Sequence, residues 1–239
     1  MSGAPAGRPR PRGGSPAGPL PDLRAFRAIC EAGARNAATA LSQMIGRPVR
    51  LEVPWARAIP LEKVAEIAGG ATRVVCALSL KVYGEARGNL LLAFGEDQVP
   101  LLLKLVVRGG GERHGTPAGF SDLAKSALRE VGNILAGAYL NAVSHLLGVS
   151  LLPSIPGLAI DMVGAVTDHL VIEMLPLSET AVVLASEVLE PASGLRGEFF
   201  FLPDPRTLPV LGRGLPGREA DGTEGRGVRR RGSTRAGGR

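Results

Sequence analysis

Three polar side chains with chemical potential lie in an otherwise apolar segment that covers residues 126–142. Ser126, Glu130 and Asn133 are spaced by four and then three residues. In an α-helix this spacing places all three within an arc of about 60°. Such a helix face offers a hydroxyl, a carboxylate and an amide to whatever contacts it.

The same arc continues with small residues, namely Gly137, Asn141 and Ser144. A solvated helix face is the simplest interpretation, but such faces usually carry Lys, Arg and Glu at i, i+4 spacing. A face with one carboxylate and a glycine would instead let another molecule approach closely, so docking or catalysis is the alternative. The opposite, apolar face comprises Leu128, Val131, Leu135, Tyr139, Ala142 and Leu146.

An internal repeat indicates how this helix is positioned. The segment AATALSQMIGRPVRLEVP from Ala37 resembles YLNAVSHLLGVSLLPSIP from Tyr139, with Gly46 and Pro54 falling on Gly148 and Pro156. Further on, GNLLLAF from residue 88 resembles GEFFFLP from residue 197. A repeat of about a hundred residues is too long for a solenoid unit. It predicts two similar half-domains around an approximate two-fold axis.

Each half repeats one order of elements, a long helix, a short extended piece, a second helix and a strand hairpin. Gly46 and Gly148 are the expected C-caps of the long helices, and Ser121 is the expected N-cap of the second one. We therefore predict an α/β fold in which duplicated α-α-β-β halves, 21–108 and 116–211, share one sheet flanked by helices. The predicted helices cover about 22–45, 60–68, 121–147 and 157–174, and the hairpin strands cover 73–83, 89–94, 179–190 and 197–202.

Most of the net positive charge lies in the terminal segments, outside the predicted folded body. The chain has 239 residues, 45% of them hydrophobic, and a formal net charge of +6. Residues 1–20 contribute +3 and residues 214–239 contribute +4, which leaves about −1 for the body. We expect residues 1–20 and 212–239 to be disordered tails, with a linker at Gly109–Gly115. A near-neutral body argues against a nucleic-acid partner.

Other residues point to no separate chemistry. Cys30 and Cys76 lie in apolar segments without ligand spacing, so we interpret them as buried hydrophobes and expect no metal site. His145 follows Ser144 in sequence, which on a helix turns the two side chains about 100° apart and argues against a triad. The N-terminus lacks a signal peptide and no segment is long enough to span a membrane, so we expect a cytoplasmic protein.

The pattern Ser126-x3-Glu130-x2-Asn133, followed by ILAG and by Asn141-Ala142, resembles the signature of the CheC family of chemotaxis phosphatases. The resemblance covers about residues 22–211 and includes the two-half layout. It implies hydrolysis of the aspartyl phosphate of a CheY-type response regulator, which brings its own Mg²⁺ and lysine, so the chain needs no cofactor. By resemblance, Asn133 positions the attacking water and Glu130 pairs with the regulator's lysine. Ser126, Gly137 and Asn141 then contact the partner.

The first half departs from this pattern. At the repeat offset, Ser126, Glu130 and Asn133 correspond to Arg24, Ala28 and Glu31, none of which matches. We therefore predict one working site in each chain.

Two other functions stay open. CheC-like proteins also partner the receptor deamidase CheD, so the chain could be a weakly catalytic or non-catalytic adaptor that binds and regulates CheD. A flagellar-switch relative of the family is the third and least favoured interpretation. We expect a monomer, because the two halves already bury what a dimer of halves would bury.

Overall fold

A computed structural model of the chain describes residues 22–107 and 120–213. Its helices are α1 (Leu23–Ile45), α2 (Val64–Ile67), α3 (Val99–Val106), α4 (Asp122–Leu147), α5 (Val163–Met174) and α6 (Leu208–Arg213). The strands are β1 (Arg50–Pro60), β2 (Val74–Gly84), β3 (Gly88–Gly95), β4 (Leu151–Pro153), β5 (Gly157–Met162), β6 (Thr180–Glu190) and β7 (Leu195–Pro203). Within the described residues, 3₁₀ turns cover Leu61–Lys63, Glu96–Gln98 and Pro205–Thr207.

The two long helices begin and end where the sequence predicts. The Ser121 hydroxyl caps α4 by accepting a hydrogen bond from the Ala124 amide at 3.2 Å. Asp22 caps α1 in the same way, through the Arg24 amide at 2.9 Å. Each helix ends at a glycine in the left-handed region, Gly46 with φ 69° and Gly148 with φ 64°, which a side chain would disfavour.

The strands form one antiparallel sheet in the order β1-β6-β7-β3-β2-β4, and β5 also pairs with β2. Both predicted hairpins, β2–β3 and β6–β7, are present. The outer strands are exchanged between the halves, because β1 pairs with β6 while β4 and β5 pair with β2. The α/β fold class with two related halves sharing one sheet is therefore confirmed.

Some predicted details of each half were wrong. The short extended piece of the first half is the 11-residue strand β1, and residues 157–162, predicted as helix, form β5. These residues pair along β2 from Val74 to Ser79, so a partner strand decides their conformation and outweighs local propensity. Each half also ends in a short helix, α3 or α6, that the prediction lacked.

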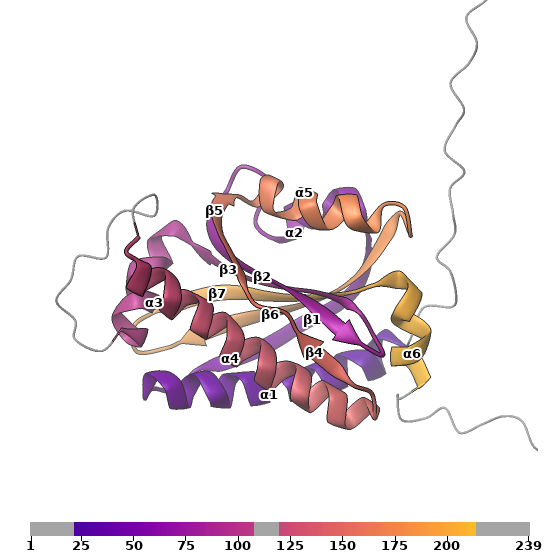
Figure 1. Cartoon of the computed structure of the whole chain (residues 1–239), viewed down its shortest axis with the longest axis horizontal. Helices are drawn as coiled ribbons and strands as arrows, with labels where there is room; N and C mark the ends of the chain where they lie inside the picture. The colour runs from indigo at the N-terminus through magenta and orange to yellow at the C-terminus, as the bar shows by residue number, and fades with distance from the viewer. Residues whose placement is uncertain (1–21, 108–119, 214–239) are drawn as a thin grey trace, which may run out of the picture.

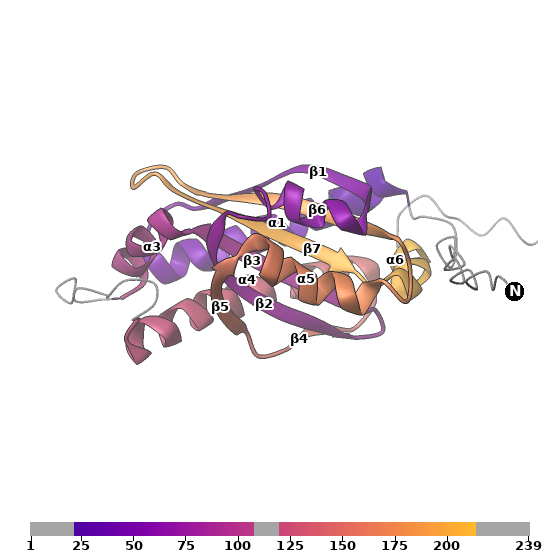
Figure 2. The ribbon, with the colours of Figure 1, turned by 90° about the horizontal axis from the view of Figure 1, so that it is seen from above.

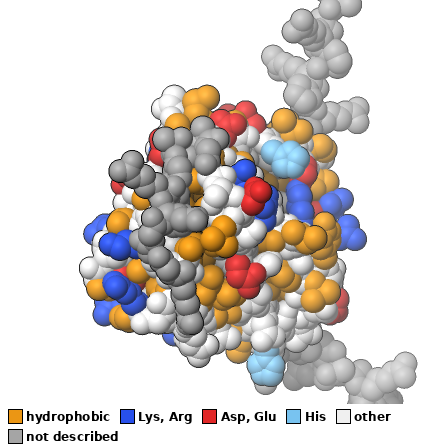
Figure 3. All heavy atoms as spheres, turned by 60° about the vertical axis from the view of Figure 1, so that its left-hand side comes forward, with side chains coloured by type: hydrophobic (Ala, Val, Ile, Leu, Met, Phe, Trp, Pro, Cys, Tyr) orange, Lys and Arg blue, Asp and Glu red, His pale blue; other side chains and the backbone are white. Residues whose placement is uncertain are grey.

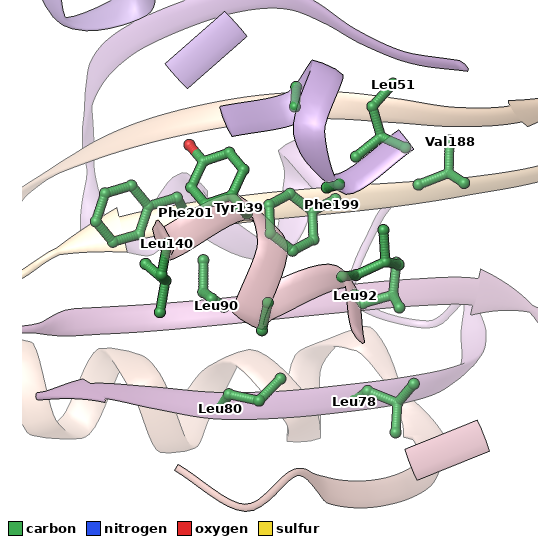
Figure 4. Packing of buried hydrophobic residues seen from close by; sticks show 14 of the residues in the cluster. Leu51, Leu78, Leu80, Leu90, Leu92, Tyr139, Leu140, Val188, Phe199 and Phe201 are labelled. Carbon is green, nitrogen blue, oxygen red and sulfur yellow. The ribbon is translucent and has the colours of Figure 1, made fainter. Parts of the chain in front are cut away.

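Helices cover both faces of the sheet (Figure 1). The long helices α1 and α4 lie on one face, and α2 and α5 lie on the other, where Figure 2 shows them in front of the strands with β1 and β4 at opposite edges. The larger core lies beneath α1 and α4 and contains Tyr139, Phe199 and Phe201 (Figure 4). The Tyr139 ring lies edge-on to Phe199, with their centroids 5.0 Å apart, a favoured aromatic geometry.

Close contact between α1 and α4 fixes the angle at which α4 presents its outer face. A Cβ atom at Gly33 of α1 would lie 2.9 Å from Tyr139 Cδ2 and 2.9 Å from Val143 Cγ2. Only a glycine allows the two helices to approach this closely. The outer face of α4 is therefore carried by a rigid pair of helices.

The two thiols belong to the larger core, as the sequence predicts, and should be inert in the folded protein. Burial raises the pKa of Cys30 to about 12 and that of Cys76 to about 11. Because the thiolate is the reactive form, we expect neither thiol to react with an aromatic disulfide reagent at pH 8 until the protein unfolds. Absorbance during titration, with and without denaturant, checks this; rapid labelling of the native protein would contradict it.

The described residues form no membrane-spanning helix, and the face shown in Figure 3 has no broad basic patch. No helix within residues 22–107 and 120–213 is long and apolar enough to cross a membrane. Figure 3 shows basic, acidic and hydrophobic side chains interspersed on one face. The tail expected at 1–20 and the linker expected at 109–115 lie outside the described residues. So does the tail expected at 212–239, except that α6 extends through Arg213.

Candidate functional site

The outer face of α4 carries the residues that the sequence singles out. Ser126, Glu130, Asn133 and Asn141 are exposed, and Gly137 is half-buried. Among the described residues, none of the four polar side chains makes a side-chain hydrogen bond or an ion pair. The group is therefore open to solvent and available to a partner.

The helix itself sets the geometry of this group. Glu130 and Asn133 are one turn apart, so their Cβ atoms are about 5–6 Å from each other. Ser126 and Asn133 are seven residues apart, which is about 10 Å along the axis. The three groups thus form a short line that a second protein could span, with the carboxylate between the hydroxyl and the amide.

The inner face of α4 holds it in place. Leu128, Val131, Leu135 and Tyr139 are all buried, as predicted. Leu146, which the pattern assigned to this face, is 48% exposed, whereas Val143 and Leu147 in the same turn are buried.

The two glycines of this part of α4, Gly132 and Gly137, have different surroundings. A Cβ atom at Gly137 would meet nothing within 4 Å among the described residues, so packing inside the protein does not require a glycine there. At Gly132 a Cβ atom would lie 3.5 Å from both Leu78 and Pro156. These are ordinary van der Waals distances, so Gly132 faces the protein interior, whereas Gly137 leaves a low point on the outer face.

Ser144 is not free, although the pattern placed it on the polar arc. Its hydroxyl accepts a hydrogen bond from the Leu151 amide at 3.1 Å. In the first half, Ser42 accepts one from Val49 at 2.8 Å. Each serine thus holds the segment that follows its long helix, which explains why the two serines match in the repeat.

Pro156 supports the site and was recognised in the sequence only as a repeat position. It is buried and packs at Gly132, one residue before Asn133. A proline cannot donate a ladder hydrogen bond, and it lies in the interruption between β4 and β5. Its counterpart Pro54 lies in a register irregularity of β1. The signal available in the sequence was the repeated proline at a fixed distance after each long helix.

The corresponding face of α1 has different chemistry. Glu31 stands at the position of Asn133, and its carboxylate accepts a hydrogen bond from Arg27 Nε at 2.9 Å. Arg35 stands at the position of Gly137, so a long cation replaces the low point. These two arginines and Glu31 line a groove beside β1, but the line of hydroxyl, carboxylate and amide is absent there.

The residues set aside in the sequence stay separate. His145 is exposed, and Asp161 lies in β5 rather than in a helix, where its side chain accepts a hydrogen bond from the Met162 amide. Within residues 22–107 and 120–213, no three His, Cys, Asp or Glu side chains are grouped so that they could hold a metal ion.

Comparison with known proteins finds similarity over a range that includes α4. The CheC-like family model matches residues 123–160, which include the outer face of α4 and Pro156. The CheY-P phosphatase CheC of Bacillus subtilis is 29% identical over 181 residues, which are 75% of this chain and 86% of the relative. The chain is therefore similar to CheC over three quarters of its length.

Two further comparisons extend this result. A CheC protein of Halobacterium salinarum is 26% identical over 182 residues, covering 76% of this chain and 90% of its own length. The crystal structure of Thermotoga maritima FliY matches with a TM-score of 0.62 and 19% identity, covering 80% of this chain and 94% of that one. At this identity, the likeness to FliY shows a shared fold alone.

Proposed function

We propose that the chain hydrolyses the aspartyl phosphate of a CheY-type response regulator at a single site on α4. The observation that carries the proposal is the free line of Ser126, Glu130 and Asn133 on a rigid helix, in a chain similar to a CheY-P phosphatase. CheD binding is the alternative role, and the experiment below includes CheD for that reason.

The reaction asks little covalent chemistry of this chain. A water oxygen forms a bond to phosphorus, and the bond between phosphorus and the aspartyl oxygen breaks, so that the carboxylate leaves with the electron pair. An acyl phosphate is labile, and the regulator supplies its own Mg²⁺ and lysine, so catalysis consists mainly of positioning. No cofactor of this chain is needed.

Each side chain then has one task. The Asn133 amide holds the attacking water in line, because it donates and accepts hydrogen bonds at any physiological pH. Glu130, one turn away, pairs with the regulator's lysine and fixes the approach. Ser126 contacts the partner at one end of the line. Gly137 and Asn141 follow Asn133 along the same helix face and contact the partner at the other end.

The deciding experiment follows the loss of radiolabelled phosphate from a CheY-type regulator in Mg²⁺. The wild-type protein is expected to accelerate the loss over the regulator's own rate, in proportion to its concentration. The assay is repeated with CheD, which could stimulate a weak enzyme. If the rate stays at the regulator's own value with and without CheD, the catalytic proposal is wrong and the chain is a binding module.

A further inference from the structure

Arg129 is an exposed cation of α4 for which the proposed function has no task. It stands four residues before Asn133, so the two side chains leave the helix about 40° apart and one turn from each other. Residues at this spacing are neighbours on the helix surface, with Cβ atoms about 5–6 Å apart. The Arg129 guanidinium is therefore within reach of a group that contacts the Asn133 amide.

The first half shows how an arginine at this position reaches its neighbour. At the repeat offset, Arg129 corresponds to Arg27 and Asn133 to Glu31. Arg27 extends along α1 and donates a hydrogen bond from Nε to the Glu31 carboxylate at 2.9 Å. The backbone geometry shared by the two long helices thus lets the arginine place its guanidinium directly beside the side chain one turn later.

The second half keeps the arginine and replaces its partner. Asn133 is uncharged, so it cannot neutralise a guanidinium as Glu31 does in the first half. Among the described residues, Arg129 has no carboxylate within 4.0 Å and makes no side-chain hydrogen bond. An unpaired arginine is ordinary on a protein surface. What distinguishes Arg129 is that its donors reach the space beside the Asn133 amide.

In the proposed reaction, the phosphoryl group of the regulator occupies this space. A water molecule that is ready to attack lies about 3–3.5 Å from phosphorus, so the phosphoryl oxygens are close to the amide that holds the water. In the transition state these three oxygens share the negative charge of the transferring group. A guanidinium stays protonated at any physiological pH and can bind two such oxygens at once.

We propose that Arg129 is a further catalytic residue, whose guanidinium donates hydrogen bonds to the phosphoryl oxygens. This inference rests on the proposed function. The bonds formed and broken stay the same: the water oxygen bonds to phosphorus, and the aspartyl carboxylate leaves with the electron pair. Arg129 keeps its proton throughout and stabilises the charge on the phosphoryl oxygens, together with the Mg²⁺ and lysine of the regulator.

This role is compatible with the task assigned to Glu130. Arg129 and Glu130 are adjacent in sequence, so their side chains project about 100° apart on the helix. They form no ion pair with each other. Glu130 can therefore pair with the regulator's lysine while Arg129 and Asn133 act on the phosphoryl group and the water.

The test compares Arg129→Gln with the wild type in single-turnover decay of radiolabelled regulator, over a range of concentrations of the full chain. Glutamine is as good a helix former as arginine, so the melting temperature should change by no more than about 2 °C. The rate at saturating concentration should fall by at least roughly tenfold. Arg27→Gln, the same substitution at the equivalent position of α1, is the matched control and should keep the wild-type rate.

A second measurement separates contact with the phosphoryl group from general attraction between charges. Calorimetry compares binding of the regulator in Mg²⁺ alone with binding in Mg²⁺ and beryllium fluoride, which stands in for the phosphoryl group. Arg129→Gln should weaken binding of the beryllium fluoride form by roughly fivefold or more and change binding of the unmodified form by no more than about twofold. Equal weakening of both forms would overturn the proposal.

The rates also separate failure of this inference from failure of the proposed function. If the wild type accelerates the decay and Arg129→Gln matches it at saturation, the role of Arg129 is wrong and the phosphatase proposal stands. If the wild type itself leaves the regulator's own rate unchanged, both proposals are wrong.

Discussion

Asn133→Ala is expected to slow the assisted loss of phosphate from the regulator by roughly 100-fold or more, because it removes the group that holds the water. The Asn133 side chain is exposed and forms no hydrogen bond within the described residues, so the melting temperature should change by no more than about 2 °C. Single-turnover decay of radiolabelled regulator measures the first effect, and differential scanning calorimetry measures the second.

The matched control is Glu31→Ala, at the equivalent position of the first half. Glu31 already accepts a hydrogen bond from Arg27, and its neighbours on α1 do not form the line found on α4. Phosphatase activity should therefore stay within about twofold of the wild type. Full activity in Asn133→Ala would contradict the assigned role of Asn133, and an equal loss in Glu31→Ala would contradict the assignment of a single site.

The sequence could predict the features that depend only on residues close to one another in the chain. The long helices, their caps at Ser121, Gly46 and Gly148, and both hairpins follow from signals within a few residues of each element. The outer face of α4 could be predicted for the same reason, because helical periodicity alone decides which residues share a face.

Features that depend on distant partners could not be predicted in this way. The conformation of residues 157–162 is decided by β2, about 80 residues earlier in the chain, so local propensity suggested a helix instead. The tie between Ser144 and Leu151 and the packing of Pro156 at Gly132 likewise require the folded chain.

Gly137 gives the sharpest test of whether the outer face of α4 is a docking surface. Gly137→Gln is expected to raise stability by up to about 1 kcal/mol, because glycine is a poor residue inside a helix. A Cβ atom there meets no atom of the described chain within 4 Å, so the side chain causes no internal clash. It would stand where the regulator approaches, so phosphatase activity should fall at least roughly tenfold.

Opposite signs for stability and activity would distinguish this effect from a folding defect. Gly137→Ala should keep most of the stability gain and lose less activity, because a methyl group adds little height. Ala28→Gln places the same side chain at an exposed position of α1 and should leave activity unchanged. Thermal melts and single-turnover decay measure the two effects. If Gly137→Gln is as active as the wild type, the regulator does not dock over this part of α4, because a long side chain at its low point would otherwise block the approach.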